Sequence, residues 1–292
     1  MTIREAEKLL KRAYSNGNLT EDEKFELTEA LTFLIEETHD PEYMMSLGGM
    51  YYEDRRFDLA LKYYEMAAGY DYNVAYECLG YIWYYGRTGE VDYKKAFGYF
   101  SRAAEAGNVV AEYKLADMYK DGKYVEQDYD KYCRTIESLY PRMKHSDWLN
   151  DPLPEISMRL ASIRREQGRI DEAIKLLLEA RPFLAERIMY NPFFGDLNNM
   201  EWLIRDLYEM IECDMNDLKL YDLHYVLQTP HKVTFRHKNK GYEVESVEED
   251  GSVAVRFGSK WYRSVKDFFA DADIGGKRLV TIPFELYGFE VK

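Results

Sequence analysis

Histidines, cysteines and carboxylates are the side chains in this sequence that could support catalysis or bind a metal. His231 and His237 have an even spacing, which would place both on one side of a strand. The sequence has no cysteine or carboxylate cluster that completes a ligand set with them. We interpret both as surface histidines on a strand, and we predict no metal site.

The three cysteines do not indicate an active site either. Cys78, Cys133 and Cys213 lie far apart, inside helical patterns, and without the surroundings of an activated thiol. An odd number of isolated cysteines argues against a disulfide framework and favours buried thiols in a reducing compartment. Carboxylate pairs such as Glu36-Glu37 arise by chance among 53 acidic residues, and the sequence has no phosphate-binding glycine motif. We therefore expect no catalytic residue and no cofactor.

The net charge of −14 is unevenly distributed along the chain. Residues 230–292 hold 11 basic and 10 acidic residues, which leaves 28 basic and 43 acidic residues in the rest. An acidic surface repels phosphate backbones, which argues against nucleic-acid binding by the helical part. One local cluster could instead bind single-stranded nucleic acid through charge and base stacking: Lys232, Arg236, Lys238, Lys240 and Trp261. The alternative, favoured because the neighbouring Glu243, Glu245 and Glu248 cancel the charge, is that these cations protect a sheet edge or dock onto the acidic helical body.

The N-terminal residues alternate charged and apolar side chains at helical spacing, unlike the continuous apolar stretch of a signal peptide. No stretch of the sequence approaches the ~18 apolar residues that a membrane span needs. We expect a cytoplasmic protein that does not contact a membrane.

The elements that would position these side chains follow a recurring helix-pair pattern. Leu79-Gly80-x-x-Trp83-x-x-Gly86 returns 36 residues later as Leu115-Ala116-x-x-Tyr119-x-x-Gly122, and 32 residues earlier as Leu47-Gly48-x-x-Tyr51. Periods of this size predict a solenoid of stacked helical hairpins. We expect the small residue of each copy to let two helices approach closely, and its large neighbours to fill the space between hairpins.

Further helices are expected on both sides of the repeats. Two precede them, over residues 2–14 and 20–39, and the second begins with a Thr20-x-x-Glu23 capping box. A linker rich in helix breakers at 146–154 leads to a fourth hairpin around Ala161 and Ala173. Helix over 200–227 would then cover the open end of the solenoid.

The hydrophobic period changes from helical to alternating after Pro230. We expect turns at 239–241 and 249–252, a short helix over 265–270 capped by Ser264, and strands around 233–235, 242–247, 252–257, 260–263 and 278–282. The predicted fold is therefore mainly α, an α-solenoid of antiparallel helical hairpins followed by a small C-terminal antiparallel β-sheet module. We divide it into residues 1–40 (helical pair), 41–145 (repeats), 146–229 (hairpin and capping helices) and 230–292 (β-rich module).

Residues 75–111 resemble a Sel-like repeat, a relative of the tetratricopeptide repeat with a longer loop inside the hairpin. The matching residues are Ala75, Leu79, Gly80, Trp83, Gly86, Val91, Asp92, Lys95, Ala96, Tyr99, Phe100, Ala103, Ala104 and Gly107. The first and fourth hairpins lack four residues of the longer loop and look more like plain tetratricopeptide repeats. The resemblance covers residues 41–140 and, more weakly, 155–185. It implies a right-handed superhelix with a concave groove, and a scaffold or adaptor role in protein complexes.

The resemblance to Sel-like repeats implies which residues line the groove. They are the residues of the first helix in each hairpin that are not used for packing. They are Tyr52, Glu77, Tyr81, Tyr84, Tyr113, Asp117 and Lys120. Tyrosine offers a large contact area at low entropic cost, together with a hydroxyl group, which suits an interface. The alternative is that these tyrosines lie at the edge of the core with their hydroxyls in water.

The function that these patterns favour is a non-enzymatic scaffold or adaptor that binds a peptide or protein segment in the groove. Self-association is left open. One alternative is a nucleic-acid-associated regulator that acts through the β-rich module, and another is an enzyme whose site forms between solenoid and sheet.

Overall fold

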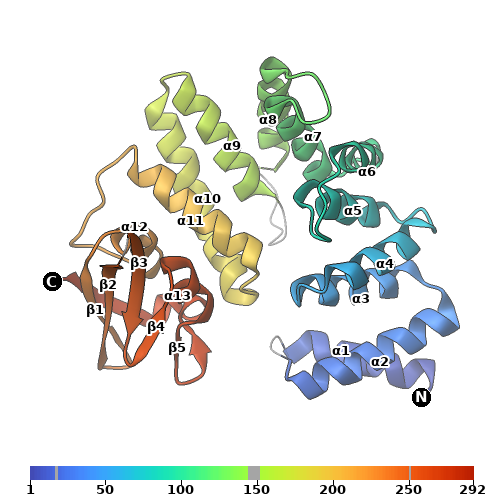
Figure 1. Cartoon of the computed structure of the whole chain (residues 1–292), viewed down its shortest axis with the longest axis horizontal. Helices are drawn as coiled ribbons and strands as arrows, with labels where there is room; N and C mark the ends of the chain where they lie inside the picture. The colour runs from blue at the N-terminus through green and yellow to red at the C-terminus, as the bar shows by residue number, and fades with distance from the viewer. Residues whose placement is uncertain (17–18, 144–151, 250) are drawn as a thin grey trace. The chain divides into compact units, whose positions relative to one another are not determined.

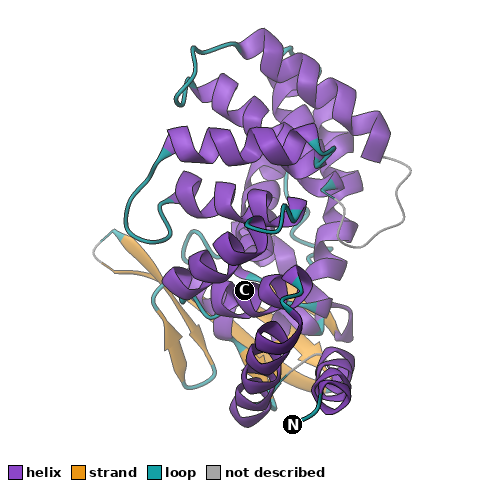
Figure 2. Ribbon diagram, turned by 90° about the vertical axis from the view of Figure 1, so that its right-hand side faces the viewer, coloured by secondary structure: helices purple, strands orange, loops and turns teal. Residues whose placement is uncertain are grey.

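A computed structural model describes residues 1–16, 19–143, 152–249 and 251–292. The chain divides into two compact units, Met1–Pro141 and Arg142–Lys292 (Figure 1). The described part of the first unit is helical, and the strands belong to the second (Figure 2). Most of the linker expected at 146–154 lies outside the described residues, and the finer division into four segments stays a prediction.

The first unit is a series of helices in which consecutive members pack side by side, α1 on α2, α3 on α4, and α5 on α6. The helices are α1 (Ile3–Asn16), α2 (Glu21–Thr38), α3 (Pro41–Glu53), α4 (Phe57–Ala68), α5 (Asn73–Tyr85), α6 (Tyr93–Glu105), α7 (Val109–Asp121) and α8 (Tyr129–Met143). The expected array of antiparallel helical hairpins is confirmed.

The helix ends follow from local hydrogen bonding. The Thr20 side chain accepts the backbone N–H of Glu23 while the Glu23 carboxylate accepts that of Thr20, which confirms the predicted capping box. Helices α5 and α7 end at Gly86 and Gly122, whose φ angles of 59° and 66° lie in the left-handed region that glycine adopts without strain.

Small residues at the helix crossings explain how the hairpins pack. A Cβ atom placed on Gly48 would lie 2.6 Å from the Tyr64 ring, and one on Gly80 would lie 2.4 Å from the Phe100 ring. In the first two hairpins the two helices therefore approach so closely that a larger residue at Gly48 or Gly80 would force the facing ring to move. Leu47 and Leu79, the large neighbours of the two glycines, are fully buried as expected.

The second unit begins with three helices, α9 (Leu153–Glu166), α10 (Ile170–Tyr190) and α11 (Phe194–Tyr208), of which α9 packs on α10 and α10 on α11. The expected continuous helix over 200–227 is wrong, because α11 ends at Tyr208. A chain of turns follows, then the 3-10 helix η1 (Leu220–Asp222) and the short helix α12 (Leu223–Val226).

The buried carboxylate of Asp222 explains this interruption. It accepts hydrogen bonds from the Arg181 guanidinium (2.8 Å), the Tyr208 hydroxyl (2.5 Å) and the backbone N–H of Lys219 (2.7 Å). These three bonds tie α10, the end of α11 and the start of η1 to one point, which a straight helix could not reach.

A five-stranded antiparallel sheet follows, in the order β4-β3-β2-β1-β7. Its strands are β1 (Lys232–His237), β2 (Lys240–Glu249), β3 (Ser252–Phe257), β4 (Lys260–Tyr262) and β7 (Leu286–Val291). Helix α13 (Val265–Asp271), capped by Ser264 as expected, packs against β3 and β4. The two-residue strands β5 (Asp273–Ile274) and β6 (Lys277–Arg278) form a separate hairpin, and the 3-10 helices η2 (Leu279–Thr281) and η3 (Pro283–Glu285) lie before β7.

The strand expected over 278–282 is wrong, since only Arg278 is extended there and η2 follows at once. The short strand β5 was missed, and so was the longer β7, which pairs with β1 at the edge of the sheet. Gly288 has a φ of 61°, and the pairing of β7 with β1 shifts register at this point. This irregularity breaks the alternating pattern that marks a strand in sequence.

Candidate protein-binding surface

The expected groove residues lie on three successive first helices of the hairpins, α3, α5 and α7. Two of them meet directly, because the hydroxyls of Tyr81 on α5 and Tyr113 on α7 are 3.0 Å apart. Tyr84 and Asp117 join the same neighbourhood through Lys114, a residue that the sequence analysis did not single out.

Lys114 is a buried lysine, only 5% exposed, surrounded by four tyrosine rings. Its Nζ donates a hydrogen bond to the Tyr85 hydroxyl (2.8 Å) and lies 3.9 Å from the Asp117 carboxylate. The ring centroids of Tyr81, Tyr84, Tyr85 and Tyr113 are 4.9, 5.6, 5.1 and 5.5 Å from this nitrogen. Cation–π attraction, one hydrogen bond and one nearby carboxylate together offset the cost of removing the ammonium group from water.

Arg87, in the loop after α5, extends this arrangement to α3. Its Nε donates a hydrogen bond to the Tyr52 hydroxyl (3.2 Å), and its guanidinium carbon lies 4.9 Å from the Tyr85 ring and 5.6 Å from the Phe57 ring. Tyr85 thus stands between the two cations. The tyrosine–cation cluster, as we call it, consists of Tyr52, Tyr81, Tyr84, Tyr85, Arg87, Tyr113 and Lys114.

The members of the tyrosine–cation cluster differ in exposure. Tyr85 is exposed, and Tyr52, Tyr81 and Arg87 are half-buried. Tyr84 and Tyr113 are buried, unlike the expectation that groove positions are free of packing. The Tyr84 ring packs against Phe100, and its hydroxyl accepts a hydrogen bond from Lys123 (2.8 Å). At these two positions the rings belong to the core, but their hydroxyls bond to protein groups, whereas the core-edge alternative placed them in water.

Burial also affects the pKa of these phenols. Desolvation raises the pKa of Tyr84 and raises that of Tyr81 well above the usual value. Tyrosine is neutral at physiological pH in any case, so both hydroxyls can donate as well as accept hydrogen bonds, and burial extends this into alkaline solution.

Glu77 and Lys120, the other expected groove residues, have partners outside the tyrosine–cation cluster. The Glu77 carboxylate accepts a hydrogen bond from the Asn108 side chain (2.7 Å), and burial raises its pKa. The Lys120 ammonium lies 5.3 Å from the Tyr132 ring centroid.

The alternative basic patch on the sheet is electrically mixed. Lys232 pairs with Glu243 (2.7 Å), Arg256 pairs with Glu245, and cross-strand pairing places Arg256 beside the exposed Trp261. Lys240 on β2 lies over the Tyr242 ring. It is on the opposite face of the sheet from Lys232 on β1, because Lys232 pairs with Glu245 and alternate residues of β2 face opposite sides. Arg236 and Lys238 are exposed. The structure therefore does not gather the five residues into one positive surface, and nucleic-acid binding stays a prediction.

The expectation of surface histidines is wrong for His237. This side chain is buried, and its Nε2 lies 2.9 Å from the carboxylate of Glu285, which η3 brings to it. His231 is half-buried, beside the hydroxyl of Thr229 (3.0 Å). Among the described residues, no group of histidine, cysteine and acidic side chains is arranged to hold a metal ion.

The cysteines are free thiols. Cys213 is buried but lies in the turns after α11, so its expected helical position is wrong. Cys78 and Cys133 are half-buried rather than buried. Desolvation raises the pKa of both Cys78 and Cys213, which makes them poor nucleophiles.

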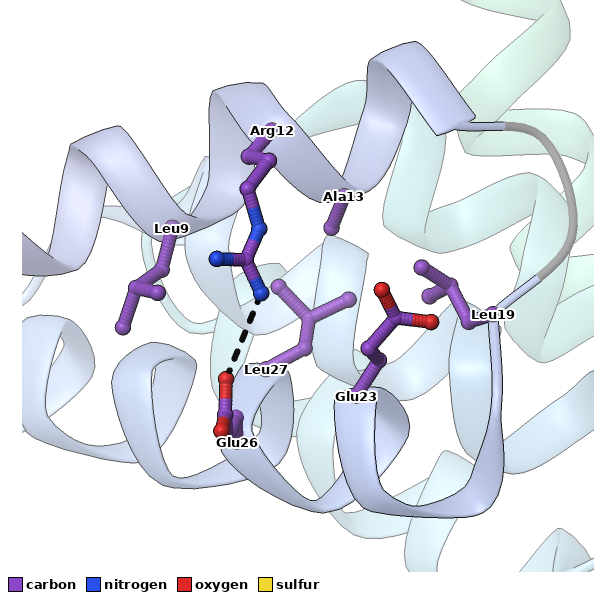
Figure 3. Close-up of a pocket in the computed structure, with 7 residues that line it drawn as sticks. All are labelled: Leu9, Arg12, Ala13, Leu19, Glu23, Glu26 and Leu27. Carbon is purple, nitrogen blue, oxygen red and sulfur yellow. Dashed lines mark ion pairs between the residues drawn. The ribbon is translucent and has the colours of Figure 1, made fainter.

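A recess between α1 and α2 is too small for a ligand (Figure 3). Its lining is Leu9, Arg12, Ala13, Leu19, Glu23, Glu26 and Leu27. The volume of about 10 Å³ corresponds to about one water molecule. The ion pair between Arg12 and Glu26 (3.6 Å) closes one side.

The fold and this surface define an α-solenoid of helical hairpins with a tyrosine–cation cluster across three of them. The family model of the Sel1 repeat matches residues 41–68, 72–108 and 109–131, so this chain carries three Sel1 repeats in its first unit. The resemblance seen in the sequence is confirmed. The first hairpin is also matched as a Sel1 repeat, although it lacks the longer loop.

Among solved structures, this chain is similar to a Sel1 repeat protein from Oxalobacter formigenes, at 20% identity over 73% of this chain and 79% of that one (TM-score 0.47). Another is c5321, a protective antigen of uropathogenic Escherichia coli with an SLR fold, at 22% identity over 63% of this chain and 36% of that one (TM-score 0.41). No curated protein matches the chain. Sel1 repeat proteins are generally protein-interaction scaffolds. Within the described ranges, none of the helices combines the length and apolar character of a membrane span.

Proposed function

We propose that the tyrosine–cation cluster binds a polypeptide segment of a protein partner, and that this chain is a non-enzymatic scaffold or adaptor. The observation that carries the proposal is the unbroken series of aromatic rings and cations from Tyr52 on α3, through Arg87 and Tyr85, to Lys114 and Tyr113 on α7. Tyrosine and arginine are enriched among the residues that dominate binding energy in protein interfaces.

The fixed conformations of side chains in the tyrosine–cation cluster also support a role in binding a polypeptide. Tyr85 stacks on Tyr81 (5.8 Å between ring centroids), contacts Tyr84 edge to face, and accepts the Lys114 hydrogen bond. A partner that covers Tyr85 and Arg87 therefore meets side chains that already have one conformation. Less side-chain entropy is lost on binding to such a surface than to a mobile one.

The experiment uses immobilised full-length chain to capture partners, followed by measurement of the dissociation constant for each captured protein. Tyr85→Ala should weaken binding at least tenfold, because it removes the exposed ring between Arg87 and Lys114. Tyr70→Ala is the matched control, since Tyr70 is an exposed tyrosine of the same unit outside the tyrosine–cation cluster.

Equal affinities of the Tyr85→Ala and Tyr70→Ala variants for every captured partner would contradict the proposal. Circular dichroism of both variants shows whether they keep the helical fold. A second copy of the chain as the partner would appear as a concentration-dependent mass in sedimentation analysis.

The proposal places the protein in the cytoplasm. The three free cysteines support this location, because an oxidising compartment favours disulfides.

A further inference from the structure

The loop between α7 and α8 forms an open hollow of about 630 Å³. Two tyrosines, three carboxylates, one amide and one lysine line it: Tyr119, Glu126, Gln127, Asp128, Tyr129, Asp130 and Lys131. The loop is held in place by two hydrogen bonds to the end of α7, from the backbone N–H of Asp128 to the Tyr119 carbonyl (2.9 Å) and from the Gln127 amide to the Lys120 carbonyl (2.8 Å). The hollow is therefore preformed.

The preceding repeat contains the same loop with the same geometry. The backbone N–H of Asp92 donates to the Trp83 carbonyl (3.0 Å), as that of Asp128 does to Tyr119. The Lys95 ammonium lies 3.6 Å from the Trp83 ring centroid, and the Lys131 ammonium lies 3.7 Å from that of Tyr119. Each aspartate also caps the following helix through its carboxylate.

The charges of the two loops differ at one place. Lys94 is exposed in the first turn of α6, just after the loop of the second repeat, and Asp130 is exposed at the matching position in the first turn of α8. The lining of the hollow therefore contains three carboxylates and one ammonium group, that of Lys131, while the ammonium of Lys123 in the same loop is bound to Asp121 and the Tyr84 hydroxyl. This hollow attracts a further cation, whereas the second repeat carries two cations side by side at this place.

The chemistry of the lining selects the kind of cation. The Lys131 ammonium already lies over one tyrosine ring, which shows that these rings accept a positive charge. A guanidinium group is planar, stacks on aromatic faces, and pairs with a carboxylate through two parallel hydrogen bonds. We propose that the hollow between α7 and α8 binds an arginine side chain of the partner's polypeptide. This rests on the proposed function, because it names the chemistry of a segment bound by the repeats.

The test is fluorescence anisotropy at ~0.15 M salt, where the charges of the distant surface are screened. The probe is a dye-labelled eight-residue peptide of alternating glycine and arginine, and its neutral counterpart has citrulline in place of arginine. Asp130→Lys introduces a lysine where the second repeat has Lys94. This change should weaken arginine-peptide binding at least tenfold. Glu105→Lys makes the same charge change at an exposed position in the last turn of α6 and should change affinity less than twofold.

Equal losses in the two variants would show binding to the general acidity of the chain and would overturn the proposal. Equal affinities of the wild-type chain for the arginine and citrulline peptides would also overturn it. The Tyr85→Ala variant separates this inference from the proposed function. It should bind the arginine peptide like the wild-type chain, because Tyr85 does not line the hollow, yet it should lose the captured partner.

Discussion

Basic side chains of the repeats repeatedly lie over aromatic rings. At least nine of them between Arg56 and Lys131 lie within the distance of about 6 Å at which a ring attracts a cation. Tyrosine is the main ring in these pairs. Much of the high tyrosine content of the repeats is therefore explained by contacts inside them, and only a minority of the rings, such as Tyr85, are exposed.

His224 on α12 is the residue of the second unit from which we expect an acid sensitivity. It is 4% exposed, stacks on Phe269 with 3.5 Å between ring centroids, and neither ring nitrogen has a hydrogen-bond partner within the described residues. Desolvation lowers its pKa from 6.5 to about 3. The folded state therefore binds the proton less well than the unfolded state, so the free energy of unfolding should fall by up to about 1.4 kcal/mol per pH unit between pH 6.5 and 3.

The measurement compares urea unfolding of the wild-type chain and His224→Phe across this pH range. The variant should be more stable at pH 7, because it removes two unpaired polar atoms, and its advantage should grow as the pH falls. Asp196 acts in the opposite direction, since burial raises its pKa to about 6, but both proteins share it and it cancels in the difference. A constant difference from pH 7 to 4 would contradict the assignment.

Gly80 offers a test of the close approach inside a hairpin. Gly80→Ala places a methyl group against the fully buried Phe100 ring and should lower the free energy of unfolding by about 1–3 kcal/mol. The control is Gly98→Ala, at an exposed helical position of α6 with no atom within 4 Å of the added Cβ. This second change should raise stability by about 0.5–1 kcal/mol, because alanine loses less conformational entropy than glycine in a helix. Destabilisation by both changes, in chemical denaturation, would contradict the crossing geometry.

At the scale of elements, Asp222 joins α10, the end of α11 and η1. Asp222→Asn removes the charge that the half-buried Arg181 faces and should cost about 3 kcal/mol of stability. Asp217→Asn makes the same chemical change in an exposed pair with Lys219 and should cost little. Denaturant titration of both variants gives the two values. If Asp222→Asn were as stable as Asp217→Asn, the buried network would not hold these elements together.

Elements whose local signals agree could be predicted from the sequence. The helical hairpins, the capping box at Thr20 and the strand Ser252–Phe257 follow from periodicity and turn residues alone. The end of α11 could not be predicted, because the cause is a tertiary network around Asp222. Strand β7 was missed for a related reason, since its bulge at Gly288 is visible only when β1 lies beside it.

The candidate surface shows the same limit. The groove positions expected from the repeat pattern included Tyr81, Tyr113 and Asp117, and these three residues lie close together in the structure. It did not find Lys114, because a lysine in a helical pattern is expected to point to solvent, and only the three-dimensional arrangement of tyrosines explains its burial. The spacing Lys114-x-x-Asp117 was the one signal that could have indicated it.

At the scale of the whole molecule, acidic charge dominates. The net charge of −14 falls toward zero near the isoelectric point of about 5.0, where mutual repulsion between copies is lost. We expect a minimum of solubility near pH 5, and light scattering across pH 4–8 measures it. His224→Phe should aggregate less than the wild-type chain at this pH, because fewer of its molecules unfold. A solubility minimum at another pH, or none, would contradict this view of the surface.

The matching loops after α5 and α7 have a consequence for how such a chain changes length. Both joints combine a left-handed glycine, a capping aspartate and a lysine stacked on the ring of the helix before it. Recombination between the two corresponding stretches of a gene would delete or duplicate one complete repeat. The loop at the point of exchange would keep the glycine, the aspartate and the lysine. The array can therefore grow or shrink in whole steps, and each duplicate can then acquire its own charge, as Lys94 and Asp130 illustrate.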